Sequence, residues 1–159
     1  MRKVIFITTL LFMSSMSQAY LTVGDKAFLP QVKVMGSKKR VDLSRLKGRV
    51  VFLEFWASWC VSCAKSFPIY NKVYNELKDQ GVIFISVNTD SSEKAAKRFL
   101  KKNPADFLVV RDTKKKAVKT YEPRGYPVGY IIDREGNIVH VEQSVPKYEE
   151  LKAKLEELI

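Results

Sequence analysis

The chain has 159 residues, of which 46% are hydrophobic, so it has the size and composition of one globular domain with an ordinary buried core. A second domain would not fit. The formal charge is +11, but the lysines and arginines are scattered and lack the interleaved aromatic residues that stack on bases. Nucleic acid is therefore not an expected partner, and most of the charge is interpreted as solvated surface.

The first 19 residues differ from the rest of the chain. Arg2 and Lys3 form a positive start, residues 4–13 are almost all apolar, and residues 17–19 supply the small-x-small pattern that a signal peptidase cleaves. The apolar run is about half of the ~20 residues that span a bilayer, so cleavage is favoured over retention as an anchor. We expect residues 1–19 to be a signal peptide and the protein to be exported, to the periplasm of a host with two membranes. Loss of Arg2 and Lys3 leaves 11 − 2 = +9 charges.

The segment that follows predicts a β-hairpin and then a central strand. Residues 31–35 and 40–43 alternate in polarity and flank a turn-like sequence at 36–38. Residues 50–56 are apolar except for Glu54, which is the pattern of a strand buried on both faces of a parallel sheet.

A helix is predicted next, because apolar residues recur at helical spacing over residues 61–80 and Gly81 supplies a C-terminal stop. Pro68 lies inside this helix and should kink it. A second buried strand is predicted at 82–87. Residues 90–93 then resemble a capping box, with Asp90 at the N-cap of another helix.

The remaining elements complete an α/β pattern. They are the rest of that helix to residue 102, a short strand at 107–110, a small helix or turn at 115–121, a hairpin of strands at 128–132 and 138–141, and a last helix capped by Ser144 with Pro146 in its first turn. The order βαβ, helix, ββα predicts a central mixed β-sheet flanked by helices on both sides.

The chain contains only two cysteines, Cys60 and Cys63, and both lie where the central strand passes into a helix. Such a short loop gives little stability when it is cross-linked, which favours redox chemistry over a structural disulfide. Free N–H groups and the dipole at a helix start favour the thiolate. We therefore expect Cys60 to attack as a thiolate of lowered pKa, and Cys63, one turn deeper, to resolve the mixed disulfide.

Further motifs occur in a fixed order around this pair. They are the run from Leu46 through Trp59-Cys60-Val61-Ser62-Cys63, then Pro68, Gly125-Tyr126-Pro127, Tyr130-Ile131-Ile132-Asp133 and Gly136. With these motifs the mature domain, residues 20–159, resembles over about residues 24–159 the thioredoxin superfamily and, within it, the exported TlpA/ResA-like branch. The resemblance implies a thioredoxin fold with an N-terminal β-hairpin extension. It also implies a thiol-disulfide oxidoreductase that reduces or isomerises disulfides of exported proteins such as apocytochrome c.

The resemblance assigns roles to individual residues. Pro127 matches the proline whose preceding peptide bond is cis in this fold, and it would bind extended substrate backbone together with Tyr126. Trp59 matches an exposed aromatic beside the nucleophile. Glu54 matches a buried acid beneath the second cysteine, where it would take the Cys63 proton.

The resemblance also implies the partners and the cofactor requirement. The redox-active disulfide would be the only redox group, with no metal and no other cofactor. A membrane thiol reductase would supply electrons, and exported cysteine-containing proteins would be the substrates. Apart from the resemblance, we expect the protein to be a monomer.

The sequence departs from the family pattern at three places. Ser66 replaces an acidic residue that is frequent three positions after the second cysteine, and Val128-Gly129 replaces Thr-Thr or Thr-Phe after the cis-proline. Substrate contacts are accordingly expected to differ from those of the family. Third, Val61-Ser62 between the cysteines is neither the Gly-Pro of general reductants nor the Pro-His of strong oxidants. Because no histidine lies between the cysteines, a reductant or isomerase is expected rather than a strong oxidant.

Several alternatives stay open at this point. The cysteine pair is also compatible with a structural disulfide or a metal clip, Glu54 with a core acid, and Pro127 with an ordinary trans proline. His140, the only histidine, keeps a copper-binding protein of the Sco type as the alternative function, although that family spaces its cysteines by three residues. The threonine and proline that a peroxiredoxin requires before its reactive cysteine are absent here. The third class of function is a thioredoxin-like adaptor that binds proteins without redox activity.

Overall fold

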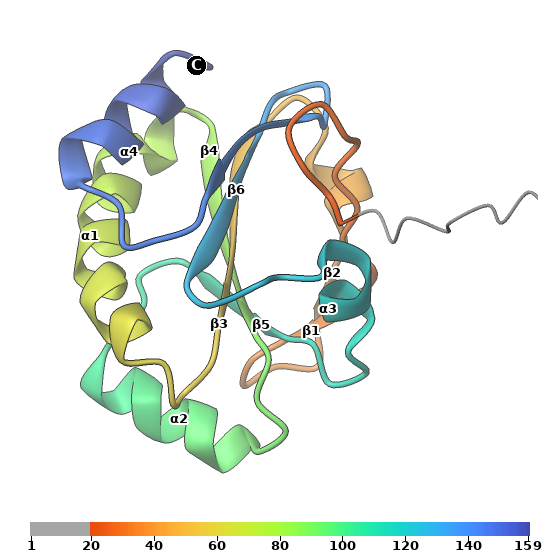
Figure 1. Cartoon of the computed structure of the whole chain (residues 1–159), viewed down its shortest axis with the longest axis vertical. Helices are drawn as coiled ribbons and strands as arrows, with labels where there is room; N and C mark the ends of the chain where they lie inside the picture. The colour runs from red at the N-terminus through yellow and green to blue at the C-terminus, as the bar shows by residue number, and fades with distance from the viewer. Residues whose placement is uncertain (1–19) are drawn as a thin grey trace, which may run out of the picture.

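The computed structural model describes residues 20–159, so the predicted signal peptide at 1–19 lies outside the described residues. The elements in chain order are β1 (Val32–Val34), β2 (Arg40–Val41), the 3-10 helix η1 (Leu43–Leu46), β3 (Val50–Trp56), α1 (Val61–Leu77), the 3-10 helix η2 (Lys78–Gln80), β4 (Val82–Asn88), α2 (Glu93–Lys102), β5 (Leu108–Arg111), α3 (Lys116–Tyr121), β6 (Val128–Ile132), β7 (Ile138–Glu142) and α4 (Tyr148–Glu156). The predicted α/β fold is confirmed, and Figure 1 shows the sheet with helices on both sides.

The strands of the described chain form one mixed sheet in the order β2-β1-β5-β4-β3-β6-β7. Strand β3 is parallel to β4 and antiparallel to β6, so it is hydrogen-bonded on both sides, as its apolar sequence predicted. Strands β1 and β2 form the predicted antiparallel hairpin. Because β1 also pairs with β5, the hairpin extends the sheet. At the other end, residues 24–26 run along the start of β7.

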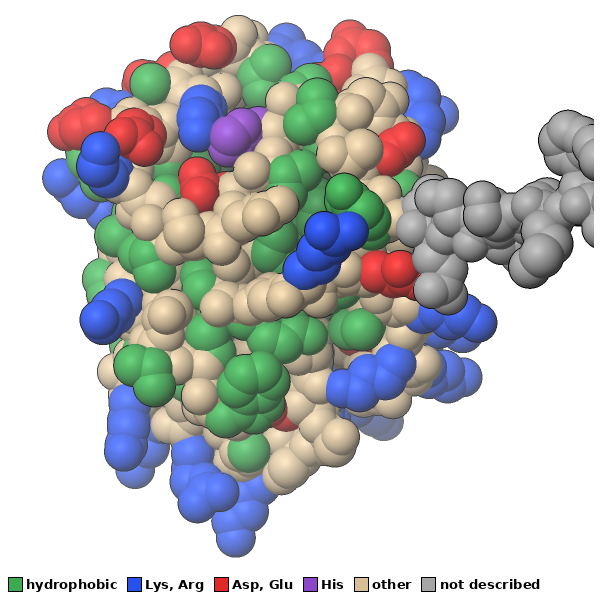
Figure 2. Space-filling model, viewed as in Figure 1, with side chains coloured by type: hydrophobic (Ala, Val, Ile, Leu, Met, Phe, Trp, Pro, Cys, Tyr) green, Lys and Arg blue, Asp and Glu red, His purple; other side chains and the backbone are tan. Residues whose placement is uncertain are grey.

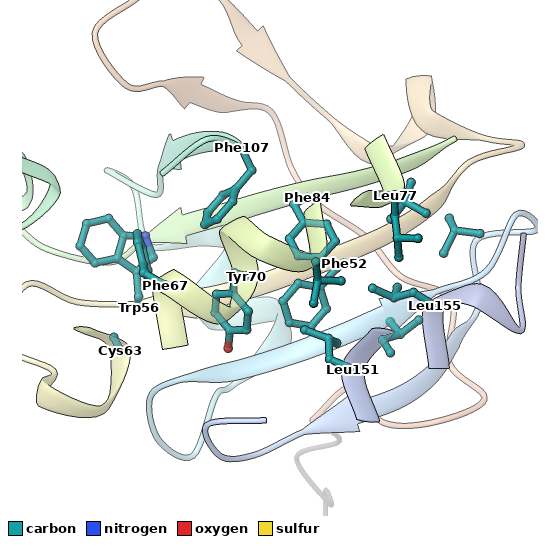
Figure 3. Close-up of a cluster of buried hydrophobic side chains, with 14 of the residues drawn as sticks. Phe52, Trp56, Cys63, Phe67, Tyr70, Leu77, Phe84, Phe107, Leu151 and Leu155 are labelled. Carbon is teal, nitrogen blue, oxygen red and sulfur yellow. The ribbon is translucent and has the colours of Figure 1, made fainter. Parts of the chain in front are cut away.

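The two faces of the sheet bury separate hydrophobic clusters, and β3 contributes to both. Side chains alternate between the faces of a strand. Phe52 contacts Tyr70 of α1 with ring centroids 5.1 Å apart, and Trp56 contacts Phe67 of α1 at 5.2 Å. Figure 3 shows this cluster, to which β3, α1 and α4 all contribute side chains. Glu54 lies between Phe52 and Trp56 in the strand, so it shares the face that α1 covers.

The sheet's other face packs against α3 and the N-terminal segment. Phe55 contacts Tyr121 of α3 at a centroid distance of 5.1 Å, and Leu29 and Val32 belong to the same cluster. Within residues 20–159, none of the helices combines the length and hydrophobicity that crossing a bilayer requires.

The helix that follows the cysteines ends where the sequence predicted. Helix α1 passes into η2, and Gly81 closes it with φ 92°, a left-handed conformation that glycine adopts without steric cost. Pro68 lies inside α1, as expected.

Two predicted helix caps are wrong. Ser92, not Asp90, is the N-cap of α2, and its hydroxyl accepts the Ala95 N–H. Asp90 is buried and bonded elsewhere. Ser144 does not cap α4: the N-cap is Lys147, without a side-chain bond, and the Ser144 hydroxyl donates to Glu142 instead. Pro146 therefore precedes α4. In both cases a different polar partner competes for the side chain that the local pattern selected.

Candidate active site

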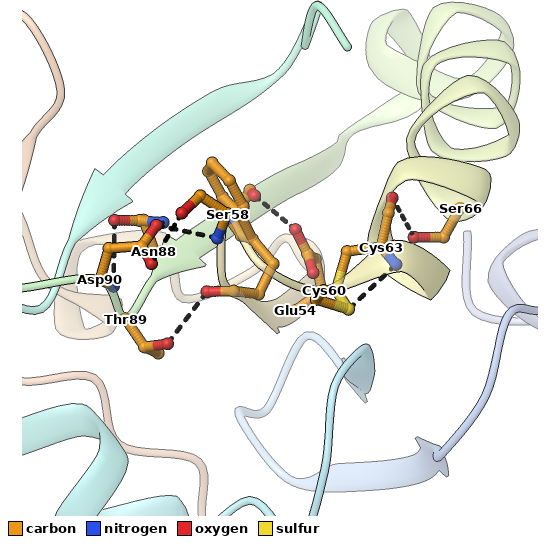
Figure 4. The surroundings of a disulfide bond; sticks show 10 residues. Glu54, Ser58, Cys60, Cys63, Ser66, Asn88, Thr89 and Asp90 are labelled. Atoms are coloured by element: carbon orange, nitrogen blue, oxygen red, sulfur yellow. Dashed lines mark hydrogen bonds between the residues drawn. A yellow bond between two sulfur atoms is a disulfide. The ribbon is translucent and has the colours of Figure 1, made fainter. Parts of the chain in front are cut away.

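Cys60 and Cys63 are joined by a disulfide at the junction of β3 and α1 (Figure 4). Cys60 is the N-cap of α1, and its sulfur accepts the Cys63 N–H at 3.0 Å. Cys60 retains 7% of its surface exposed, whereas Cys63 is fully buried. Cys60 is therefore the more accessible of the two cysteines, as an attacking role for Cys60 requires.

The start of α1 provides an electrostatic environment that favours a negative sulfur. The first turn contains no acidic side chain, and the N–H groups of a first helical turn have no partners within the helix. Together with the helix dipole, they stabilise an anion at the N-cap. On the basis of this geometry we predict that the pKa of the Cys60 thiol is lowered in the reduced protein.

Glu54 lies in the layer between the sheet and α1 and is 1% exposed. The Ser86 hydroxyl, on the neighbouring strand β4, donates to Oε1, while Oε2 has no hydrogen-bond partner among the described residues. Burial raises the Glu54 pKa to about 8, against the opposing effect of the Ser86 hydrogen bond. A carboxyl that changes protonation near neutral pH is suited to proton exchange. Its catalytic role stays a prediction.

Ser66, where the family often has an acid, is fully buried, and its hydroxyl donates to the Cys63 carbonyl at 3.0 Å. A carboxylate at this position would enter an already buried layer that contains Glu54, at a large desolvation cost. The serine instead satisfies a carbonyl of the first turn.

The predicted substrate-binding residues lie together. The Tyr126–Pro127 peptide bond is cis, as the resemblance implied. Pro127 is buried and Tyr126 half-buried. Trp59 is 71% exposed, and its ring lies edge-to-face with Tyr126 at a centroid distance of 5.6 Å. The cis-proline loop is thus placed against the residue that precedes Cys60, and exposed Val61 adds apolar surface.

The unusual glycine after the cis-proline has a packing explanation. A Cβ at Gly129 would lie 2.5 Å from two ring atoms of Phe52. Phe52 is itself fixed between Tyr70 and Phe84. Residue 129 is therefore small because a core aromatic ring occupies the space.

His140 lies away from the cysteines. It stands on β7 opposite Ile131, which in turn pairs with Phe52, four residues before the end of β3. Its Nε2 lies 2.9 Å from the Lys154 Nζ and 3.6 Å from a Glu142 oxygen. Figure 2 shows this histidine among charged side chains, whereas hydrophobic side chains gather in the lower half of the same face. Nothing in this geometry favours a shared metal site.

Two polar residues near the site were not assigned to it from the sequence: Ser86, and Asp90, which was predicted only as a helix cap. Both come from β4 or the residues just after it, the strand parallel to β3. A signal was present: the run Asn88-Thr89-Asp90 is polar and follows a buried strand, and open α/β sheets place functional groups at the carboxyl ends of such strands.

The cysteine disulfide at a helix start, a cis-proline loop beside it and a mixed sheet covered by helices on both faces define a protein of the thioredoxin class. Within that class, the chain belongs to the Redoxin family, whose model matches residues 22–159. The ResA-like resemblance is confirmed as well.

Individual relatives support this placement. The chain is 40% identical over 103 residues to the thiol-disulfide oxidoreductase ResA of Bacillus subtilis, a match that covers 65% of this chain and 58% of that protein. ResA of Bacillus thuringiensis subsp. konkukian is 35% identical over 121 residues, with 76% and 68% covered. A structure described as a DsbE-type thiol:disulfide interchange protein from Chlorobium tepidum superposes with a TM-score of 0.78 at 34% identity, covering 87% of this chain and 98% of that one. The match spans less than two thirds of the Bacillus subtilis relative.

Proposed function

We propose that the protein is a thiol-disulfide oxidoreductase that cycles the Cys60–Cys63 pair between disulfide and dithiol. The observation that carries the proposal is the asymmetry of the pair: Cys60, which keeps 7% of its surface exposed, occupies the N-cap of α1 beside the Trp59–Tyr126 surface, and Cys63 is fully buried. That arrangement gives one sulfur for attack from outside and one for attack from within.

In the reducing direction, the Cys60 thiolate attacks one sulfur of a client disulfide. A mixed disulfide forms, and the other client sulfur leaves as a thiolate. Cys63 loses its proton and attacks the Cys60 sulfur, which expels the second client thiolate. The client gains two electrons and, on protonation, two thiols, while the protein is left with the Cys60–Cys63 disulfide. A dithiol reductant restores the starting state by the reverse exchange.

Glu54 accepts the Cys63 proton in this scheme. It lies on the face of β3 that α1 covers, and the burial that raises its pKa to about 8 makes it a base of suitable strength for a thiol. Trp59, Tyr126 and Pro127 would bind client backbone around the mixed disulfide.

The cellular setting is part of the proposal. The signal-like sequence at 1–19 supports export to the periplasm, where a membrane thiol reductase would supply electrons and exported cysteine-containing proteins would be the clients. Apocytochrome c is the client we propose on the resemblance to ResA-type proteins. We propose that the protein acts as a monomer, without metal or other cofactor.

Equilibration of residues 20–159 in glutathione buffers, read by alkylation and mass, tests the proposal. A reductant is expected to give a potential of ~−220 to −270 mV, whereas ~−120 mV would identify a disulfide donor. Cys63→Ser should trap a mixed disulfide with a cysteine-containing peptide, and Cys60→Ser should not. A pair that fails to cycle in any buffer would contradict the oxidoreductase function.

A further inference from the structure

The loop that joins β3 to α1 is held by residues from the end of β4. The Trp56 carbonyl accepts the Thr89 N–H at 3.0 Å and the Thr89 hydroxyl at 3.1 Å. Ser58 lies two residues after Trp56 in the loop. The Asp90 carboxylate accepts the Ser58 N–H at 2.9 Å and the Ser58 hydroxyl at 3.1 Å. Figure 4 shows Asp90 and Ser58 facing each other across this loop. Cys60 follows Ser58 by two residues, so these bonds act close to the sulfur.

Asp90 is itself fixed in position. Its Oδ2 accepts the Asn88 side-chain N–H at 2.8 Å, and its own backbone N–H donates to the Asn88 Oδ1 at 3.3 Å. Asn88 is fully buried and Asp90 is 8% exposed. Among residues 20–159, Asp90 has no ion-pair partner, so three hydrogen bonds from Ser58 and Asn88 stabilise the buried carboxylate. Within the described chain, the side chain of Asp90 bonds only Ser58, in the loop before Cys60, and Asn88, which fixes Asp90 in place. Asp90 is therefore suited to holding that loop in position.

The need for such support depends on the redox state. In the disulfide form the bond to Cys63 already ties Cys60 to α1. In the dithiol form that tie is absent, and the position of the Cys60 sulfur depends on the backbone of residues 57–60. Only a sulfur that stays at the N-cap benefits from the N–H groups and dipole of α1, because this effect fades within the first turn.

We propose that Asp90 is a positioning residue for Cys60: by holding the Ser58 peptide, it keeps the reduced sulfur at the N-cap of α1. The inference rests on the proposed oxidoreductase function. It adds a residue outside the cysteine motif and the cis-proline loop, contributed by the segment between β4 and α2.

Asp90→Ala distinguishes a positioning role from a purely electrostatic one, because the two roles predict opposite changes in the Cys60 pKa. If hydrogen bonding positions the sulfur, the freed loop should raise the Cys60 pKa by about one unit. If the negative charge of Asp90 merely repels the thiolate, its removal should lower that pKa. The measurement is the pH dependence of Cys60 alkylation in the reduced protein, with the rate of client disulfide reduction as a second readout. That rate should fall at pH 7 by less than about tenfold, because one pKa unit changes the thiolate fraction by at most a factor of ten and the more basic thiolate is the better nucleophile.

Asp90→Asn is the conservative variant. An amide oxygen can accept from Ser58 N–H and from Asn88, and its NH₂ group can donate to the Ser58 hydroxyl, so all three bonds can be kept without the charge. It should not raise the Cys60 pKa. Asp112→Ala is the matched control: Asp112 is 3% exposed and accepts the Lys116 and Val118 N–H groups at 2.9 Å, at the start of α3. It should cost comparable stability and leave the Cys60 pKa unchanged.

The outcomes distinguish this inference from the proposed function. If Asp90→Ala leaves the Cys60 pKa unchanged or lowers it, or if Asp90→Asn raises it equally, the positioning role is wrong even though the wild-type protein turns over. If the wild-type disulfide does not cycle, the proposed function itself fails. Thermal unfolding of each variant verifies that the protein is folded at the temperature of the assay.

Discussion

Glu54 is a carboxylic acid placed where its charge is costly, and its two oxygens have different surroundings. Oε1 accepts the Ser86 hydroxyl, and Oε2 is unpartnered among the described residues. A hydroxyl that donates to a carboxylate stabilises its charged form, so Ser86 lowers a pKa that burial raises. Ser86 therefore adjusts the pH at which Glu54 can accept a proton.

Ser86→Ala should raise the Glu54 pKa further, by roughly 1–2 units, because a hydrogen bond to a charged group contributes about 1.5–3 kcal/mol. The pH profile of resolution by Cys63 should move to higher pH by the same amount. The measurement is an NMR titration of the Glu54 carboxyl carbon, alongside the pH dependence of turnover. Ser66→Ala removes another buried serine that does not bond Glu54 and serves as the control. A Glu54 pKa that stays constant or falls in Ser86→Ala would contradict this account.

At the scale of the elements, the sequence predicted what local patterns determine. The uninterrupted apolar run of β3, the helical periodicity of α1 and the stop at Gly81 depend on neighbouring residues, and all three are confirmed. The cap at Asp90 failed for a tertiary reason. Its carboxylate bonds Ser58, which is 32 residues away, and no local pattern reports that contact.

The site shows the same division. The cysteine pair and the cis Tyr126–Pro127 bond were predicted because they belong to short motifs. The Ser86 contact with Glu54 depends on the parallel register of β3 and β4, which pairs these two residues across the sheet. Gly129 was interpreted as a change in substrate contacts, whereas the register of β6 places it over Phe52. Composition and periodicity do not predict contacts between strands that are distant in sequence.

Gly129→Ala tests the packing explanation. The added methyl group would lie 2.5 Å from Phe52 ring carbons, and the ring is confined by its aromatic neighbours. We expect a loss of about 1–3 kcal/mol in the free energy of unfolding, measured by urea titration of the oxidised protein. Gly125→Ala, where a Cβ meets nothing within 4 Å, is the control and should change stability by less than about 0.5 kcal/mol. Equal urea midpoints for the two variants would refute the packing explanation.

For the molecule as a whole, burial of Glu54 makes stability depend on pH. An unfolded chain has the ordinary Glu pKa of 4.5, whereas the folded value is about 8. Between these values the folded state binds more protons than the unfolded state, so the free energy of unfolding falls as pH rises. The contribution of Glu54 is fully present below pH 4.5 and is lost by about pH 8, with an upper bound of about 5 kcal/mol.

Glu54→Gln should flatten this dependence, because a neutral amide does not titrate. The measurement is urea unfolding of the oxidised protein at a series of pH values from 4.5 to 8. Wild-type protein should lose stability across the series faster than the variant does. Glu157→Gln, at an exposed position near the C-terminus, should retain the wild-type slope. Parallel curves for wild type and Glu54→Gln would show that the buried carboxyl does not control the pH response.

The hairpin at one end of the sheet bears on how such a protein avoids aggregating with the partly unfolded chains proposed as its clients. An open sheet edge offers unpaired backbone groups that recruit extended chains. Here the outer strand β2 is only two residues long and begins with Arg40. At the opposite end, Gly24 and Asp25 bond Ile138 at the start of β7. The β2 edge thus offers little length for strand addition, and the start of β7 is covered, so the sheet has fewer places at which it could recruit an extended chain.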